Sequence, residues 1–205
     1  MGGSFDPVHL AHLKLAEVAL QTLDLDEVRW IPAGQPWQKA RQLAAAEHRL
    51  GMVQAAIANE PRFVADDIEL RRQGPSYTLD TVRALQTERP DVAQWWLILG
   101  QDQCANLPTW HGWRELLGRV GLAVAARGDA AIDVPEAVRQ AAGHDIRALP
   151  MPAMDVSSTA IRAHLNAGGS PLALADGLVP AGVARYIANH HLYAPQGQPS
   201  LHGHP

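Results

Sequence analysis

Residues 2–12 of the chain read Gly2-Gly3-Ser4-Phe5-Asp6-Pro7-Val8-His9-Leu10-Ala11-His12. Glycine allows a close approach of the backbone to a ligand and unusual φ angles, and proline suits the first turn of a helix. This pattern predicts a glycine turn followed by a helix over residues 9–22, with Asp6 as a turn and cap residue. His9 and His12 are three positions apart and therefore share one face of that helix.

The two histidines lie where a helix N-terminus carries a partial positive charge. A cationic side chain in a first turn is unfavourable by about 0.3–1 kcal/mol unless an anion lies between the side chain and the helix end. The stretch therefore indicates a bound anion. A pair of histidines on an ordinary surface helix is the alternative interpretation.

A second helix start far along the chain has the same character. It reads Ser157-Ser158-Thr159-Ala160-Ile161-Arg162, and the pair Gly168-Gly169 marks the end of the helix. Ser157 or Ser158 can cap this helix, and the planar guanidinium of Arg162 suits phosphate oxygens. Ser-Ser-Thr alone is also typical of an ordinary cap. Two candidate anion sites in one chain together predict a polyphosphate ligand.

Composition narrows the classes of protein. The chain has 205 residues, a formal net charge of −4 and a pI near 6.2. That size suits one domain with a full core, and the charge argues against a general nucleic-acid binder. The single cysteine, Cys104, excludes an internal disulfide framework and fits a reducing compartment. No apolar run has the length of a membrane span, and we expect a cytoplasmic protein.

Strand and helix patterns alternate along the chain, which predicts an α/β fold: a Rossmann-like doubly wound parallel sheet with helices on both faces and a helical C-terminal part. Ligands of such sheets bind beyond the carboxyl ends of the strands. The predicted strands cover residues 27–32, 62–70, 95–100 and 120–126. The predicted helices cover residues 9–22, 40–58, 78–88, 113–117, 135–142, 158–167 and 179–190.

The two ends of the chain lead to separate expectations. A glycine turn in such a sheet should follow a strand, yet only Met1 precedes Gly2. Either the first strand lies upstream of Met1 or the central strand is truncated, and we favour the upstream strand. Residues 1–193 are expected to form one domain. Residues 194–205, rich in Pro, Gly, Gln and His, are expected to form a mobile tail.

The two phosphate-binding segments resemble the signatures of the nucleotidyltransferase superfamily of α/β adenylyl- and cytidylyltransferases. Further segments are similar to one of its families, the bacterial nicotinate-nucleotide adenylyltransferases, and the similarity runs from residue 2 to about residue 193. These segments are Gly74-Pro75-Ser76-Tyr77-Thr78, Ile98-Leu99-Gly100-Gln101-Asp102, Pro108-Thr109-Trp110 and Tyr186-Ile187-Ala188-Asn189-His190-His191-Leu192-Tyr193.

The resemblance implies a reaction and a set of roles. ATP and nicotinate mononucleotide would be the substrates, deamido-NAD and pyrophosphate the products, and Mg²⁺ would be held mainly by phosphates and water. The residues that would bind the phosphates during catalysis are His9, His12 and Arg162. The other residues implied to bind ATP, through its phosphates or its adenosine, are Gly2, Gly3, Ser4, Phe5, Lys39, Gly100, Asp102, Ser158 and Thr159. The acceptor nucleotide would contact Tyr77, Thr78, Trp110 and Arg127, with an aromatic face beside its pyridinium ring.

Two alternatives stay open at this point. Another adenylyltransferase, such as a phosphopantetheine adenylyltransferase, shares the two signatures but lacks the Ser-Tyr-Thr and Tyr-Ile-x-x-His segments. A non-catalytic nucleotide sensor on the same fold is the alternative from a different class. Loss of a histidine or of Arg162 would favour the sensor, and all three residues are present.

Overall fold

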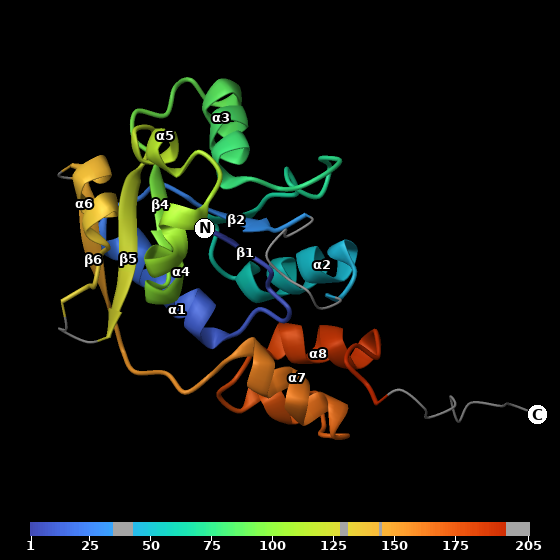
Figure 1. The fold of residues 1–205 in the computed structure, drawn as a ribbon. Coiled ribbons are helices and arrows are strands. Elements are labelled where there is room, and N and C mark those ends of the chain that lie inside the picture. Colours follow the sequence, from blue (N-terminus) through green and yellow to red (C-terminus); the bar gives the residue numbers. More distant parts are fainter. Residues whose placement is uncertain (35–42, 128–130, 144, 196–205) are drawn as a thin grey trace, which may run out of the picture.

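The computed structural model describes residues 1–34, 43–127, 131–143 and 145–195. Within them, parallel strands form two three-stranded sheets, in the orders β1-β2-β3 and β4-β5-β6 (Figure 1). All pairings are parallel, as the alternation of strands and helices predicts. The strands are β1 (Gly2–Gly3), β2 (Val28–Pro32), β3 (Phe63–Ala65), β4 (Trp96–Leu99), β5 (Gly121–Arg127) and β6 (Ile146–Met151).

At least one helix follows each described strand, and the last strand is followed by two. The α-helices are α1 (Leu10–Thr22), α2 (Ala46–Ile57), α3 (Thr78–Glu88), α4 (Gln101–Asn106), α5 (Trp113–Leu117), α6 (Glu136–Ala142), α7 (Ser158–Asn166) and α8 (Ala181–Asn189). Short 3₁₀ helices are η1 (Leu107–Thr109) and η2 (Leu172–Ala175).

Alternate residues of the strands enter different hydrophobic clusters. Ile98 of β4 packs in a cluster with residues of α1, α2, α7 and α8, whereas its neighbours Leu97 and Leu99 pack in a second cluster with residues of α3, α4, α5 and α6. Because successive strand side chains point to opposite faces, this division means that helices cover both faces of the sheet. The predicted fold class is confirmed.

Most predicted elements are present, with corrections at three places. The strand expected over residues 62–70 is only three residues long, because the Asp66 carboxylate accepts a hydrogen bond from the Ile68 backbone N–H and turns the chain. Strand β6 was not predicted: Leu149 is its only fully buried residue, so the strand shows no alternating pattern. Helix α4 was also not predicted, since six residues are too few to show a helical period.

The first strand, which we expected upstream of Met1, is instead the two-residue β1, formed by the glycines themselves. Gly2 and Gly3 pair with Ile31 and Pro32 of β2, and the Met1 amino group donates to the Arg29 carbonyl at 2.8 Å. Burial lowers the pKa of that amino group to about 6. The carboxyl end of β1 therefore leads directly into residues 4–12, as a ligand site at the strand ends requires.

Candidate active site

The two phosphate-binding segments, which are more than 140 residues apart in sequence, lie in contact. The Ser158 hydroxyl donates to the Pro7 carbonyl at 2.9 Å, and Arg162 Nη1 donates to the Asp6 carbonyl at 2.5 Å. Arg162 Nη2 also donates to the Thr159 hydroxyl at 3.1 Å. Ser157 is the N-cap of α7, where its hydroxyl accepts from the Ala160 N–H. The structure thus brings together the two helix N-termini that the sequence predicts to share a polyphosphate.

The rings of His9 and His12 at the start of α1 stack on each other. The His9 and His12 rings lie 3.7 Å apart between centroids with an interplanar angle of 27°, and Phe5 meets His12 edge-on at 5.2 Å. The His9 backbone N–H donates to His12 Nδ1 at 3.1 Å. Since Nδ1 of His12 accepts, the proton of the neutral ring is on Nε2, which is then a hydrogen-bond donor for an anion.

The geometry corrects three expectations about this turn. Helix α1 begins after His9, so Pro7 lies outside its first turn. Asp6 does not cap the helix; it is fully buried, and its carboxylate accepts from Ala44 N–H and the Tyr193 hydroxyl. The left-handed residue of the turn is Phe5, with φ of 46°, whereas Gly2 and Gly3 are strand residues. Glycine is used at position 3 for space, because a Cβ there would lie 3.1 Å from the Phe5 ring.

His9 is neutral rather than cationic. Burial lowers its pKa to about 4, and its buried Nδ1 has no hydrogen-bond partner among the described residues. A neutral ring at the N-terminus of α1 avoids the unfavourable interaction with the helix dipole without an anion. The indication of an anion therefore rests on Arg162 and on the convergence of the two helix starts, and not on the charge of His9.

The free energy of unfolding is expected to fall as the pH drops from about 6.5 to about 4 because of His9. The unfolded chain binds a proton at the ordinary histidine pKa of 6.5, and the folded chain only at about 4. The stabilisation is therefore fully present above 6.5 and is lost towards pH 4, to an extent of about 3 kcal/mol. Urea unfolding of the wild type and of His9→Gln at pH 7 and pH 5 measures this change.

The comparison between variants removes the contribution of Met1, whose amino group also has a pKa lowered by burial. The substitution His164→Gln, at an exposed position of α7, is the matched control for loss of one histidine. An equal loss of stability at pH 5 in the wild type and in His9→Gln would contradict the assignment of the effect to His9.

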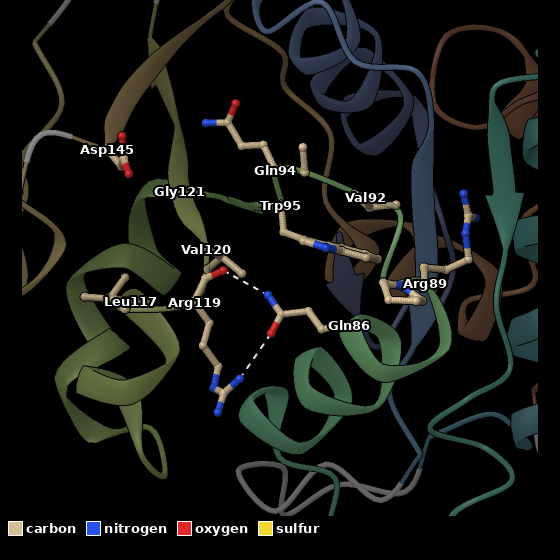
Figure 2. Close-up of a pocket in the computed structure, with 13 residues that line it drawn as sticks. Gln86, Arg89, Val92, Gln94, Trp95, Leu117, Arg119, Val120, Gly121 and Asp145 are labelled. Atoms are coloured by element: carbon tan, nitrogen blue, oxygen red, sulfur yellow. Dashed lines mark hydrogen bonds between the residues drawn. The ribbon is translucent and has the colours of Figure 1, made fainter.

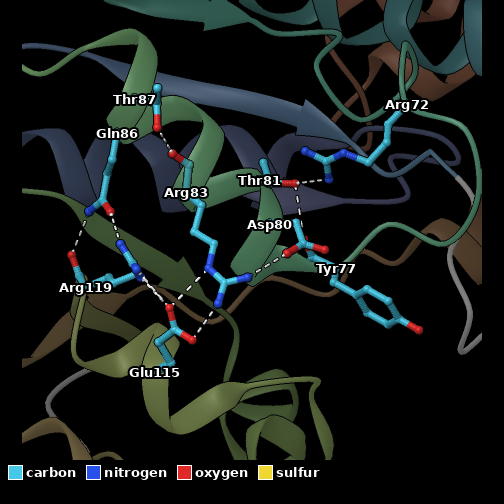
Figure 3. A network of polar contacts seen from close by, with 9 residues as sticks. All are labelled: Arg72, Tyr77, Asp80, Thr81, Arg83, Gln86, Thr87, Glu115 and Arg119. Atoms are coloured by element: carbon cyan, nitrogen blue, oxygen red, sulfur yellow. Dashed lines mark hydrogen bonds and ion pairs between the residues drawn. The ribbon is translucent and has the colours of Figure 1, made fainter.

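The predicted acceptor segment, residues 74–78, is held against the end of β2 by Glu69. Burial raises the pKa of Glu69, while hydrogen bonds from Thr81, the Gly34 N–H and Ser76 lower it. The Thr81 hydroxyl donates to Glu69 at 2.9 Å. Figure 3 shows the second contact of this hydroxyl, which accepts from Arg72 at 3.1 Å. A Cβ at Gly34 would collide with the Glu69 backbone, so only glycine fits between β2 and this segment.

Helix α3 presents the acceptor residues at its N-terminus. Tyr77 is the N-cap and Thr78 the first residue of the helix. Helix α3 is joined to α5 by the ion pair between Arg83 and Glu115 at 2.6 Å, and Gln86 of α3 donates to the carbonyl of Arg119, which follows α5, at 3.0 Å. In Figure 3 the Tyr77 ring points away from these contacts. These exposed contacts contribute little stability singly, but together they fix how the two helices lie.

The Tyr77 ring also has a partner that the sequence did not suggest. Its centroid lies 4.6 Å from that of His111, at an interplanar angle of 34°. His111 follows Trp110, so the residues after η1 are adjacent to the start of α3. The Trp110 indole is partly buried against the second hydrophobic cluster, and its Nε1 has no hydrogen-bond partner in the described part of the chain. The structure therefore joins three of the four predicted acceptor positions in one region.

The predicted adenosine residues follow β4. Gly100 is the N-cap of α4, and Asp102 lies in the first turn of that helix and is exposed. Gly100 has φ of −74°, and a Cβ added to it would meet nothing within 4 Å. Neither backbone strain nor a protein neighbour requires glycine there. Lys39 lies outside the described residues, and Arg127 ends β5 with no side-chain placement described.

A cavity of about 350 Å³ lies elsewhere on the molecule. It is lined by residues at the amino ends of β4 and β5, including Trp95, Arg119 and Gly121 (Figure 2). Ligands of parallel α/β sheets bind at the carboxyl ends of the strands, where the motifs described above are found. The cavity is therefore not the candidate active site.

Sequence reasoning missed the buried residues that hold the site together. Arg49 and Glu69 lie within segments read only as helix and strand, and Tyr193 belongs to a family-like segment without an assigned role. Arg49, 2 % exposed, donates to the carbonyls of Ser4 and Gly34. A charged residue at an apolar position of α2 was the one signal available, because buried arginines are rare unless paired.

Comparisons with known proteins agree with this geometry. A family model described as cytidylyltransferase-like matches residues 1–164. The chain belongs to the cytidylyltransferase-like family. Curated relatives in it carry the name probable nicotinate-nucleotide adenylyltransferase. The relative from Methylibium petroleiphilum is 58% identical over 95% of this chain and 91% of its own length, and that from Bordetella petrii is 49% identical over 94% and 96%.

Solved structures share the fold of this chain. The Plasmodium falciparum nicotinic acid mononucleotide adenylyltransferase, complexed with APC, superposes with a TM-score of 0.74 at 18% identity, and 94% of each chain is covered. The same protein complexed with NaAD gives a TM-score of 0.73 at 20% identity. Across the described residues of the present chain, no helix is long and apolar enough to cross a membrane.

Proposed function

We infer that the protein is a nicotinate-nucleotide adenylyltransferase, which transfers the adenylyl group of ATP to nicotinate mononucleotide and releases pyrophosphate. The observation that carries this inference is the contact between the two helix starts, in which Ser158 and Arg162 bond to the carbonyls of Pro7 and Asp6. That contact supports one shared phosphate site for the histidine pair and the guanidinium. The relatives with the same name, which match this chain over nearly its whole length, support the choice of acceptor.

The reaction needs alignment and charge stabilisation rather than a covalent intermediate. A phosphate oxygen of nicotinate mononucleotide attacks the α-phosphorus of ATP, and the bond from that phosphorus to the pyrophosphate oxygen breaks. Two anions that repel each other must be held in line. Charge also builds on the leaving pyrophosphate, and preorganised donors stabilise it.

The donors where the two helix starts meet each have a role in this proposal. His12 donates its Nε2–H to the α- or β-phosphate, and the adjacent His9 ring supports it by stacking. Arg162 keeps one Nη1–H on the Asp6 carbonyl and offers its remaining N–H groups to the pyrophosphate. The residues that surround the phosphates with backbone and hydroxyl donors are Gly2, Gly3, Ser4, Phe5, Ser158 and Thr159, and Lys39 adds a further cation.

The remaining residues hold the two nucleosides. Gly100, with open space where its Cβ would be, lets the adenosine approach the backbone, and Asp102 accepts from ribose hydroxyls. The pyridinium ring of the acceptor stacks on an aromatic face formed by Tyr77 or Trp110. Thr78 at the start of α3 donates to the ring carboxylate, and Arg127, the last residue of β5, also binds the acceptor.

Mg²⁺ enters this proposal with ATP. In the described part of the chain, no three His, Cys, Asp or Glu side chains gather into a group that could hold a metal ion. The Asp6 carboxylate at the junction is already hydrogen-bonded to Tyr193 and Ala44. These residues do not fit a metal site made by the protein alone, so the ion would be bound by phosphate oxygens and water, from which magnesium dehydrates reluctantly.

Pyrophosphate release tests the proposed function. Purified protein is mixed with Mg·ATP and either nicotinate mononucleotide or 4′-phosphopantetheine, and the dinucleotide product is identified by mass. Release with nicotinate mononucleotide is expected. Release only with phosphopantetheine would assign the chain to the alternative transferase, and ATP binding without release under any condition would favour the sensor.

A further inference from the structure

Asp6 is fully buried at the point where the two phosphate-binding segments meet. Its carboxylate accepts hydrogen bonds from the Tyr193 hydroxyl at 2.7 Å and from the Ala44 N–H at 3.2 Å. Its backbone carbonyl accepts from Arg162 at 2.5 Å. Asp6 therefore contacts the C-terminal segment through its side chain and the Arg162 guanidinium through its main chain.

Arg49 holds the same turn from the other side. It donates to the carbonyls of Ser4 at 3.2 Å, Ala44 at 3.1 Å and Gly34 at 3.4 Å. Burial lowers the pKa of Arg49, while the nearby charge of Asp6 raises it. Both the N–H and the carbonyl of Ala44 are thus bound by a pair of oppositely charged buried side chains, and the turn has little freedom to shift.

The backbone after α8 adopts an unfavourable conformation that brings Tyr193 to this place. Tyr193 has φ of 61°, and His191, two residues before it, has φ of 50°. Left-handed backbone is unfavourable at a non-glycine residue and persists only where the surrounding structure holds it. The contact with Asp6 spans 187 positions of sequence, and the hydroxyl also lies 3.9 Å from the Met52 sulfur.

We propose that Tyr193 is a positioning residue for adenylyl transfer: its hydroxyl fixes the Asp6 carboxylate, and Asp6 in turn sets where Arg162 meets the leaving pyrophosphate. This rests on the proposed function. Tyr193 itself touches no reacting atom. Without the hydroxyl, the buried carboxylate has lost a donor and reorients, and the Asp6 carbonyl that receives Arg162 moves with it. A misplacement of about 1 Å can lower a rate by about 10².

The substitution Tyr193→Phe tests this, since it removes one oxygen atom and keeps the ring. The kcat for pyrophosphate release is expected to fall by about 10- to 100-fold, with little change in the KM for nicotinate mononucleotide, because the acceptor segment is held by Glu69 and not by Asp6. Tyr186→Phe is the matched control. It removes the hydroxyl of a half-buried tyrosine on α8 that contacts His48 at 3.3 Å, and wild-type kcat is expected.

The melting temperatures of both variants are measured together with the kinetics. A purely structural role would lower the melting temperature of Tyr193→Phe and leave kcat unchanged at temperatures where the protein is folded. That result, or an equal fall in kcat for both variants, would overturn the proposal. Absence of pyrophosphate release by the wild-type protein is a different result, and it would contradict the proposed function instead.

Discussion

Nicotinate mononucleotide is expected to be used with a kcat/KM up to about 10⁴ times that of nicotinamide mononucleotide. The two acceptors differ by a carboxylate against an amide of nearly the same shape, so shape discriminates little. The proposed site offers donors: the Thr78 hydroxyl, the free N–H groups in the first turn of α3 and backbone amides after Trp110. An amide NH₂ placed against such donors leaves a buried polar group unpaired, which is costly.

Steady-state kinetics with both acceptors at saturating Mg·ATP measure this preference. The variant Thr78→Val removes a donor at almost constant volume and is expected to reduce the ratio of the two kcat/KM values. Thr87→Val is the matched control, because Thr87 lies at the exposed far end of α3 and its hydroxyl donates to the Arg83 carbonyl. Equal kcat/KM values for the two acceptors, or a preference for the amide, would overturn the acceptor assignment.

Replacing Arg162 or His12 with alanine is expected to lower kcat by about 10²–10³ and to change the acceptor KM much less. Both side chains would act on charge that develops as pyrophosphate leaves, so their loss affects the transition state more than the bound substrates. For His12 the structure adds a reason: Nδ1 accepts from the His9 backbone N–H, so Nε2 is the ring nitrogen left to donate to a phosphate.

The kinetics of Arg162→Ala and His12→Ala are compared with those of Arg185→Ala, which removes an exposed arginine on α8. The control is expected to retain the wild-type kcat. Turnover near the wild-type value in both site variants would show that the two signatures do not participate in catalysis here. A rise in the KM for nicotinate mononucleotide alone would instead place these side chains on the acceptor.

The sequence by itself determined the fold class and the two ends of the phosphate site. Alternating apolar runs predicted β2, β4 and β5, and the Ser157 cap and the Gly168-Gly169 pair predicted the start and the end of α7, because these signals are local in the chain. The residue types in the two signatures also identified the ligand chemistry, since donors at helix N-termini suit phosphate whatever the rest of the fold. Strand β6 was not predicted, because an edge strand with one buried side chain shows no alternation of apolar and polar residues.

Only the tertiary structure decided what holds that chemistry in place. That His9 is neutral follows from its burial, and burial depends on the residues that the fold packs around it. Asp6 was read as a local cap but is bound to Tyr193 across 187 positions, and the position of Arg49 beneath Ser4 and Gly34 is equally non-local. Such contacts leave no periodic or capping signal in the sequence. They form because buried polar groups must be hydrogen-bonded, and these groups become neighbours only after folding.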